Sequence, residues 1–133
     1  MTSEFSTPIR VYIEDTDAGG IVYYVNYLKY FERARTEFMR ALGYDKPAFM
    51  DEDAMFVVSD ARVRYRSPAR LDDQLQATAR VVKVGAATLV FDQTVVRAGE
   101  ILVEGQVTIA LVQVADGRPR RLAGTLREQL ADQ

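Results

Sequence analysis

One amphipathic helix limits the fold of this chain more than any other feature. Between Asn26 and Leu42, apolar side chains recur at the three- and four-residue spacing of a helix and form one broad face. That face contains Tyr27, Phe31, Ala34, Phe38 and Leu42. Asn26 is the expected N-cap, and Gly43 suits the left-handed residue that ends a helix. Such a broad apolar face needs a second layer to cover it.

Most of the remaining chain shows strand patterns. Apolar and polar residues alternate from Pro8 to Glu14, which predicts a half-buried strand. After a connection through Pro47, the expected strands are Met55 to Tyr65, Gln74 to Val84, Thr88 to Arg97 and Ile101 to Val114, with turn signals at Ser67-Pro68, Gly85, Gly99 and Asp116-Gly117. The capping-box pattern Thr125-Leu126-Arg127-Glu128 predicts a short C-terminal helix. We therefore expect one α+β domain over residues 1–133, with an antiparallel sheet of about five strands wrapped around one long central helix.

The chain contains neither histidine nor cysteine. Ser-His-Asp and Cys-His nucleophiles therefore cannot be built, and the common zinc and iron sites lack their ligands. Magnesium and calcium sites usually gather several acidic ligands, and Asp15 and Asp17 alone are too few. We expect neither a metal nor a cofactor.

Charge and hydropathy argue against two classes of partner. The net charge of -2 and the pI near 5.2 give no basic field, so nucleic acid is not an expected partner. Residues Met1 to Pro8 lack a basic stretch followed by an apolar one, and no run approaches the roughly 20 apolar residues of a membrane span. We expect a cytoplasmic protein without a membrane span.

Two aspartates and a glycine pair stand before the helix, in Glu14-Asp15-Thr16-Asp17-Ala18-Gly19-Gly20. A free helix N-terminus presents unsatisfied N–H groups and partial positive charge, so it can bind a carbonyl oxygen that becomes negative during reaction. A neighbouring carboxylate can attack or deprotonate without an imidazole. The pattern indicates acyl transfer or acyl hydrolysis, with a turn-forming aspartate as the alternative interpretation of Asp17.

Four stretches of the chain are similar to the hot-dog-fold acyl-CoA thioesterases. They are Arg10 to Gly20, Asn26 to Leu28, Phe31 to Glu37 and Arg66 to Asp73. The sequence most resembles the branch associated with the Tol-Pal system, and next the hydroxybenzoyl-CoA thioesterases. The resemblance implies a hot-dog fold, an acyl-CoA substrate hydrolysed to a free acid and coenzyme A, and a homodimer or dimer of dimers. An acyl carrier protein is an alternative carrier of the acyl group.

The resemblance also implies roles for particular residues. Asp17 would act as the nucleophile or as the base that activates water, and the backbone N–H at Tyr24 would hold the thioester oxygen. The Tol-Pal branch usually carries histidine at this second position, whereas the hydroxybenzoyl branch carries tyrosine. The expected substrate-binding residues are Asn26, Val58, Ser59, Lys83 and Arg118. Of these, we expect Val58 and Ser59 to face the catalytic aspartate of a second subunit, and the two basic residues to contact the coenzyme A phosphates.

The arginines carry two further expectations. Its helical angle places Arg35 on the apolar arc, where a buried guanidinium requires a partner. We expect a carboxylate contact, either inside the subunit or at a subunit interface. Arg62, Arg64 and Arg66 share one strand face, which is typical of a solvated charged surface and also suits phosphate binding.

Two other functions are alternatives to a thioesterase. A hot-dog dehydratase acting on acyl carrier protein is disfavoured, because that chemistry relies on histidine. A non-catalytic module that binds acyl groups or acyl carrier protein is the alternative from another class. Turnover of acyl-CoA by the purified protein distinguishes an enzyme from a binder.

Overall fold

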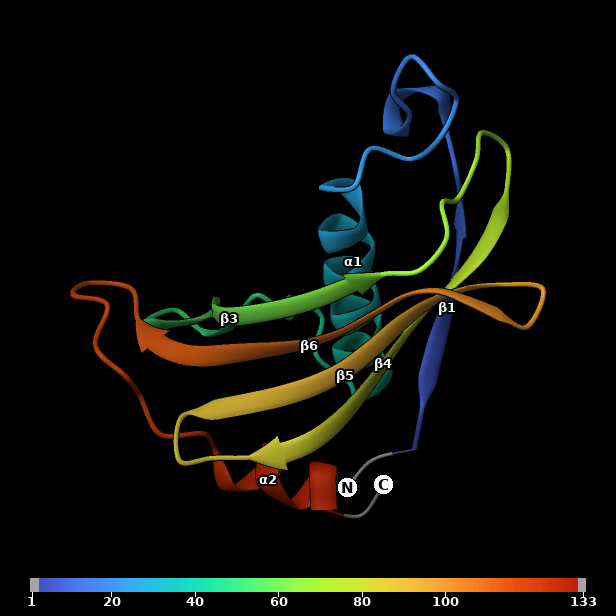
Figure 1. The fold of residues 1–133 in the computed structure, drawn as a ribbon. Helices are drawn as coiled ribbons and strands as arrows, with labels where there is room; N and C mark the ends of the chain where they lie inside the picture. Colours follow the sequence, from blue (N-terminus) through green and yellow to red (C-terminus); the bar gives the residue numbers. More distant parts are fainter. Residues whose placement is uncertain (1–2, 132–133) are drawn as a thin grey trace.

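One curved antiparallel sheet, with six strands in residues 3–131, is the largest element of the fold, and a long helix lies against one of its faces (Figure 1). The computed structural model describes residues 3–131. The helical elements are η1 (Ile13–Asp15, a 3₁₀ turn), α1 (Asn26–Ala41) and α2 (Gly124–Ala131). The strands are β1 (Phe5–Arg10), β2 (Phe49–Asp51), β3 (Ala54–Tyr65), β4 (Gln74–Val84), β5 (Thr88–Arg97) and β6 (Glu100–Gln113). Their order in the sheet is β1-β4-β5-β6-β3-β2, and all neighbours are antiparallel. The predicted α+β architecture is confirmed.

The predicted meander of β4, β5 and β6 is also confirmed. Each of these strands pairs with the next along the chain. Only Ala98 and Gly99 connect β5 to β6, and both have positive φ, 48° and 84°. A two-residue hairpin with positive φ at both positions matches the right-handed twist of its strands. The sequence signal at Gly99 therefore reflects a real conformational requirement.

The apolar face of α1 packs on the inner face of the sheet. Phe38 meets Phe91 of β5 edge to face, with ring centroids 5.6 Å apart. Phe31, which is fully buried, lies over Gly105 of β6, where a Cβ atom would come within 2.8 Å of the Phe31 ring. Glycine is therefore needed at this crossing, because any side chain would push the helix from the sheet. Neither described helix is long and apolar enough to cross a membrane.

The strand predicted over Pro8 to Glu14 was placed wrongly. The observed strand, β1, ends at Arg10, and the chain then turns into η1. The carboxylate of Asp15 accepts a hydrogen bond from the Tyr12 N–H at 2.8 Å, and the Asp15 N–H donates to the Tyr12 carbonyl at 3.0 Å. These local bonds compete with strand pairing and leave Ile13 76% exposed.

One predicted end of the long helix was wrong and the other is confirmed. The N-cap is Val25, and Asn26 is the first helical residue; its side chain does not cap the helix but donates to the Asp15 carbonyl at 2.8 Å. At the other end, Gly43 has φ +105°. The Tyr44 N–H reaches the Met39 carbonyl at 3.2 Å, as expected where a glycine ends a helix.

Two short elements complete the fold. The connection through Pro47 contains β2, which pairs with the start of β3 and was not predicted. The short C-terminal helix is confirmed as α2, but it begins at Gly124, one residue before the predicted cap at Thr125.

Candidate active site

Asp17 lies at the start of a tight turn that precedes α1. Its N–H donates to the Ile21 carbonyl at 3.0 Å, and its carbonyl accepts from the Gly20 N–H at 3.1 Å. The side-chain Oδ1 accepts from the Gly19 N–H at 2.9 Å, so one carboxylate oxygen helps to shape the turn. Within residues 3–131, the other oxygen, Oδ2, accepts no hydrogen bond. The side chain is exposed and one oxygen is available for chemistry.

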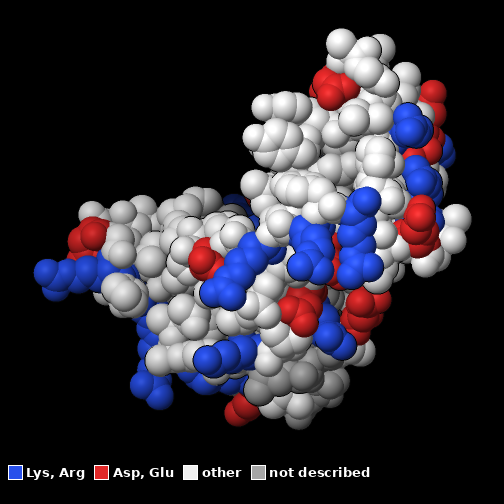
Figure 2. All heavy atoms as spheres, in the orientation of Figure 1, with Lys and Arg blue, Asp and Glu red and all other residues white. Residues whose placement is uncertain are grey.

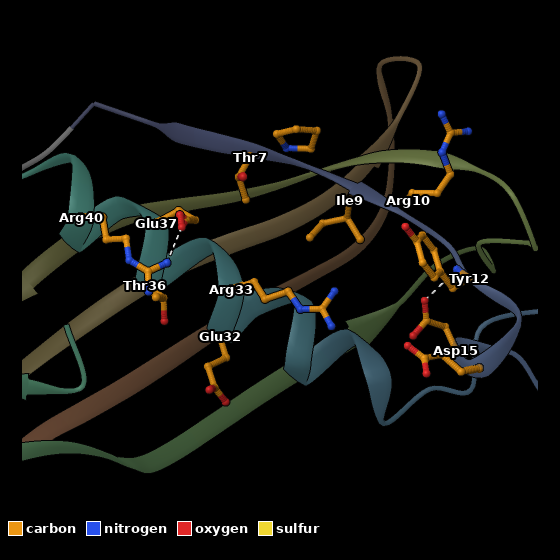
Figure 3. A pocket seen from close by; sticks show the side chains of 12 residues that line it. Thr7, Ile9, Arg10, Tyr12, Asp15, Glu32, Arg33, Thr36, Glu37 and Arg40 are labelled. Carbon is orange, nitrogen blue, oxygen red and sulfur yellow. Dashed lines mark hydrogen bonds and ion pairs between the residues drawn. The ribbon is translucent and has the colours of Figure 1, made fainter. Parts of the chain in front are cut away.

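Asp15 differs from Asp17, because its hydrogen bonds connect the loop to the start of α1. Its Oδ2 accepts from the Tyr12 N–H, as Figure 3 shows. Its carbonyl accepts from the Tyr23 N–H at 2.9 Å and from the Asn26 side chain at 2.8 Å. Among the described residues, the buried Tyr30 hydroxyl has no hydrogen-bond partner, and burial together with the nearby Asp15 charge raises the pKa of this phenol. Asp15 and Asn26 therefore hold the turn and the helix N-terminus in one fixed geometry.

The N-terminus of α1 presents free donors. The Tyr23 N–H is used by the Asp15 carbonyl, and the Asn26 N–H by the Tyr23 carbonyl. In the described part of the chain, neither Tyr24 nor Val25 donates its backbone N–H to any acceptor, and no side chain caps the helix. Two N–H groups at the positive end of a helix dipole form a site that can stabilise an oxyanion.

An apolar hollow of about 320 Å³ adjoins these donors. The ring of Tyr65, at the end of β3, lies 5.9 Å from the Tyr24 ring and 5.7 Å from the Tyr27 ring. The Tyr27 hydroxyl accepts from the Ala69 N–H at 2.9 Å, which fixes the loop after β3 against the helix. Burial and then the neighbouring Tyr24 raise the pKa of Tyr65, so its hydroxyl stays neutral near pH 7. Sequence reasoning did not select Tyr65; the similarity of Arg66 to Asp73 to the thioesterases was the nearest signal.

A single protomer does not gather all the predicted site residues. Asp17 and Tyr24 lie at the N-terminal end of α1, whereas Val58 and Ser59 lie in the middle of β3. Val58 is 54% exposed, and the Ser59 hydroxyl donates to the Thr108 carbonyl at 3.4 Å. The end of β4 and the connection after β6, which carry Lys83 and Arg118, lie at the opposite end of the molecule from the Asp17 loop (Figure 1). Both basic side chains are exposed, and the Arg118 Nε lies 3.8 Å from an oxygen of Asp116.

The predicted carboxylate partner of Arg35 is not found inside the subunit. Among the described residues no carboxylate lies within ion-pair distance, and the Arg35 Nη1 instead donates to the Gln93 Oε1 at 3.0 Å. The Gln93 amide in turn donates to the carbonyls of Phe31 and Thr78 at 2.9 and 3.0 Å. A neutral amide can reach this deep position without adding a second buried charge, which explains why it replaces the expected carboxylate. Burial lowers the pKa of the Arg35 guanidinium, and the charge of Glu32 opposes this.

Charged side chains also cover two other surfaces. Basic and acidic groups form a mixed band on the face shown in Figure 2. Three arginines of the outer sheet face form ion pairs: Arg62 with Asp60, Arg66 with Glu104, and Arg80 with Asp92. A groove of about 540 Å³ between β1 and α1 is lined by paired charges such as Arg40 and Glu37 (Figure 3) and contains none of the predicted site residues. Within residues 3–131, no three acidic side chains gather closely enough to hold a metal ion.

The sheet curved around one helix, with an acidic turn at the helix N-terminus, has the architecture of the hot-dog thioesterases, as predicted. A crystal structure of a probable thioesterase from Bartonella henselae matches it with a TM-score of 0.82 at 34% identity, covering 92% of this chain and 100% of that chain. A DHNA-CoA thioesterase from Staphylococcus aureus, 22% identical with a TM-score of 0.90, shows the same fold over 97% of this chain and 89% of that chain.

The chain belongs to the Thioesterase superfamily, which matches residues 19–104. The acyl-CoA thioester hydrolase YbgC of Escherichia coli O6:H1 is 42% identical over 122 residues, covering 91% of this chain and 91% of that protein. The acyl-CoA thioesterase YbgC of Haemophilus influenzae is 41% identical over 116 residues, covering 86% of this chain and 85% of that protein. The family prediction made from the motifs is therefore confirmed.

Proposed function

We propose that this chain hydrolyses an acyl-CoA thioester to a free acid and coenzyme A, with Asp17 as the catalytic carboxylate. The observation that carries the proposal is that, within residues 3–131, one Asp17 oxygen accepts no hydrogen bond and the backbone N–H groups of Tyr24 and Val25, at the start of the helix that follows, donate none. The relatives that act on acyl-CoA support the substrate class. A carboxylate next to a preorganised oxyanion site is sufficient for acyl hydrolysis without an imidazole.

Two routes use the same groups. In the first, Asp17 takes a proton from water while the water oxygen attacks the thioester carbon. The carbonyl oxygen becomes negative and is held by the Tyr24 N–H. The C–S bond then breaks, and the thiolate of coenzyme A leaves and takes up the proton. In the second, Asp17 attacks the carbon itself, the thiolate leaves, and water hydrolyses the resulting anhydride and restores the carboxylate.

A second subunit completes the proposed site. In the described structure the outer edge of β3 pairs with β2 only at its first two residues, Ala54 and Met55, and an exposed strand edge invites pairing. We place the partner along this edge, with Val58 and Ser59 beside Asp17 of the partner subunit. Light scattering at micromolar concentration should show a dimer or a dimer of dimers. A fully active monomer would contradict this arrangement.

The coenzyme A phosphates would be held by exposed cations, and we favour Lys83 and Arg118. Charge reversal at either residue should raise KM more than it lowers kcat, and the effect should weaken with added salt because exposed charges are screened. Arg62 and Arg64 serve as comparison positions. If they change KM while the favoured pair does not, the nucleotide lies elsewhere.

Replacement of Asp17 by asparagine tests the catalytic assignment. Asparagine can still accept the Gly19 hydrogen bond, but it cannot act as a base or as a carboxylate nucleophile. Asp17→Asn should lower kcat by about 10²- to 10⁴-fold, with the fold retained by circular dichroism. Asp15→Asn is the matched control and should lower kcat far less, because its side chain supports the loop.

Two outcomes would contradict this assignment. Equal losses of kcat in the Asp17→Asn and Asp15→Asn variants would show that Asp17 has only a structural role. Acyl-CoA that binds to the wild-type protein without being hydrolysed would favour the non-catalytic binding module.

A further inference from the structure

A second hollow, of about 420 Å³, lies between the C-terminal half of α1 and β3. We call it the Arg35 groove. Its apolar wall is formed by Met39, Met55, Val57, Val58 and Ile109. Arg35 lines it as a buried cation, 9% exposed. Hollows of this size with apolar walls and a few placed polar groups are typical of small-molecule sites.

Arg35 has donors to spare in this groove. Its side chain makes one hydrogen bond within residues 3–131, to the neutral amide of Gln93, and it forms no ion pair there. Glu32 lines the same groove but is exposed, on the side of α1 that faces β3 (Figure 3). A buried guanidinium without a counter-charge is costly, and its planar fork matches a carboxylate with two parallel hydrogen bonds. Glu32 acts on Arg35 only from a distance, and within residues 3–131 no carboxylate lies within ion-pair range of the guanidinium.

The Arg35 groove shares Val58 with the proposed active site. Val58 lines the groove, and the proposed dimer places it beside Asp17 of the partner subunit. An acyl group held at the helix N-terminus of one subunit would then extend into the Arg35 groove of the other. This step rests on the proposed function and its dimer.

We propose that the Arg35 groove receives the acyl group and selects substrates whose chain ends in a second carboxylate, with Arg35 as the specificity-determining residue. The methylene groups of a short dicarboxylic acyl chain would pack on the Met and Val walls, while the distal carboxylate meets the guanidinium. A chain that ends in a methyl group fills the same walls but leaves the cation unpaired. The groove therefore favours a carboxylate end over a methyl end of equal length.

A matched pair of thioesters tests the selection. Adipoyl-CoA and hexanoyl-CoA both carry six-carbon acyl groups and differ in the presence of a terminal carboxylate. Arg35→Met should lower kcat/KM for adipoyl-CoA by roughly 10- to 100-fold, the loss expected for a charged hydrogen bond, with a much smaller change for hexanoyl-CoA. Arg33→Met is the control, because Arg33 lies on the same helix but is exposed and lines a different groove. Equal changes for both thioesters would overturn the proposal.

Direct binding makes the test independent of catalysis and of the folding of the variant. Calorimetry with wild-type protein should show that the non-hydrolysable thioether S-(5-carboxypentyl)-CoA binds at least roughly tenfold more tightly than S-hexyl-CoA. Asp17→Asn should keep this preference even if the catalytic assignment is wrong. Equal affinity of the two thioethers would overturn the proposal. So would an Arg35→Met variant that loses its dimer in light scattering while its preference between the thioesters is unchanged, because the anion would then be a carboxylate of the partner subunit.

Discussion

The two ends of α1 are built in opposite ways. At the N-terminus, the bonds that fix the Asp17 turn join residues close in the chain: Gly19 to Asp17 are two apart, and Asn26 to Asp15 eleven apart. In the C-terminal half, Arg35 bonds to Gln93 across 58 positions. The first region is exposed and leaves donors and an acceptor free, whereas the second is buried and uses tertiary contacts. Changes in the first should therefore affect activity, whereas loss of the buried Arg35–Gln93 contact in the second should mainly affect stability.

After Asp17→Asn, removal of the Tyr24 N–H is expected to have the largest effect on kcat. Tyr24→Pro deletes this donor at a position just before the helix, where proline is tolerated, so the fold should persist. We expect kcat to fall by about 10²- to 10³-fold, as for other oxyanion donors. Tyr24→Phe keeps the N–H and should lose far less. A folded Tyr24→Pro variant with normal kcat would remove this N–H from the mechanism.

Loss of the buried amide should mainly affect stability. Gln93→Leu removes the acceptor of the Arg35 Nη1 and one donor from each of the carbonyls of Phe31 and Thr78. We expect the free energy of unfolding in urea to fall by about 3 kcal/mol. Gln106→Leu is the control, because this exposed amide donates to Asp92 at the surface and its loss should cost under about 0.5 kcal/mol. Similar values for the two variants would show that the Arg35 contact contributes little.

A substitution at Gly105, where α1 crosses β6, should lower the free energy of unfolding nearly as much. Gly105→Ala places a Cβ 2.8 Å from the Phe31 ring and 3.0 Å from the Arg62 carbonyl, and the backbone atom cannot move aside easily. Overpacking of this kind typically costs about 1–3 kcal/mol, measurable by denaturant unfolding. Gly124→Ala meets no atom within 4 Å and should be close to neutral. An unchanged Gly105→Ala variant would mean that the helix can shift without cost.

The smallest expected effect is a pH-dependent change in Tm that depends on Asp73, in the loop between β3 and β4. Burial alone would raise the pKa of Asp73, but hydrogen bonds from the Arg97 side chain and the Arg70 N–H hold this pKa below its ordinary value. The ionised form therefore stabilises the fold at neutral pH, and this contribution is lost as pH falls below the usual aspartate range, about 4. Asp73→Asn should lower the Tm at neutral pH and differ little from wild type at about pH 2. Asp45→Asn, at an exposed position, should match wild type throughout. A constant difference in Tm across the pH range would exclude the linkage.

The sequence predicted those parts of the site that depend on neighbouring residues. The acidic turn, the helix beginning near Asn26 and the end at Gly43 follow from local patterns, and the structure has all three. The same local reasoning failed between Val11 and Asp15. There, a side chain that bonds to the backbone three residues away bent a stretch whose apolar alternation favoured a strand.

By itself, the sequence determined the α+β class, the single long helix and the place of a carboxylate before its N-terminus, because periodicity and turn chemistry are properties of short segments. Only the tertiary structure decided that Tyr65 joins Tyr24 and that the cation at Arg35 meets an amide instead of a carboxylate. Those partners lie on strands far along the chain. Which side chains come together at a helix face is set by strand order and register, and no local pattern specifies these.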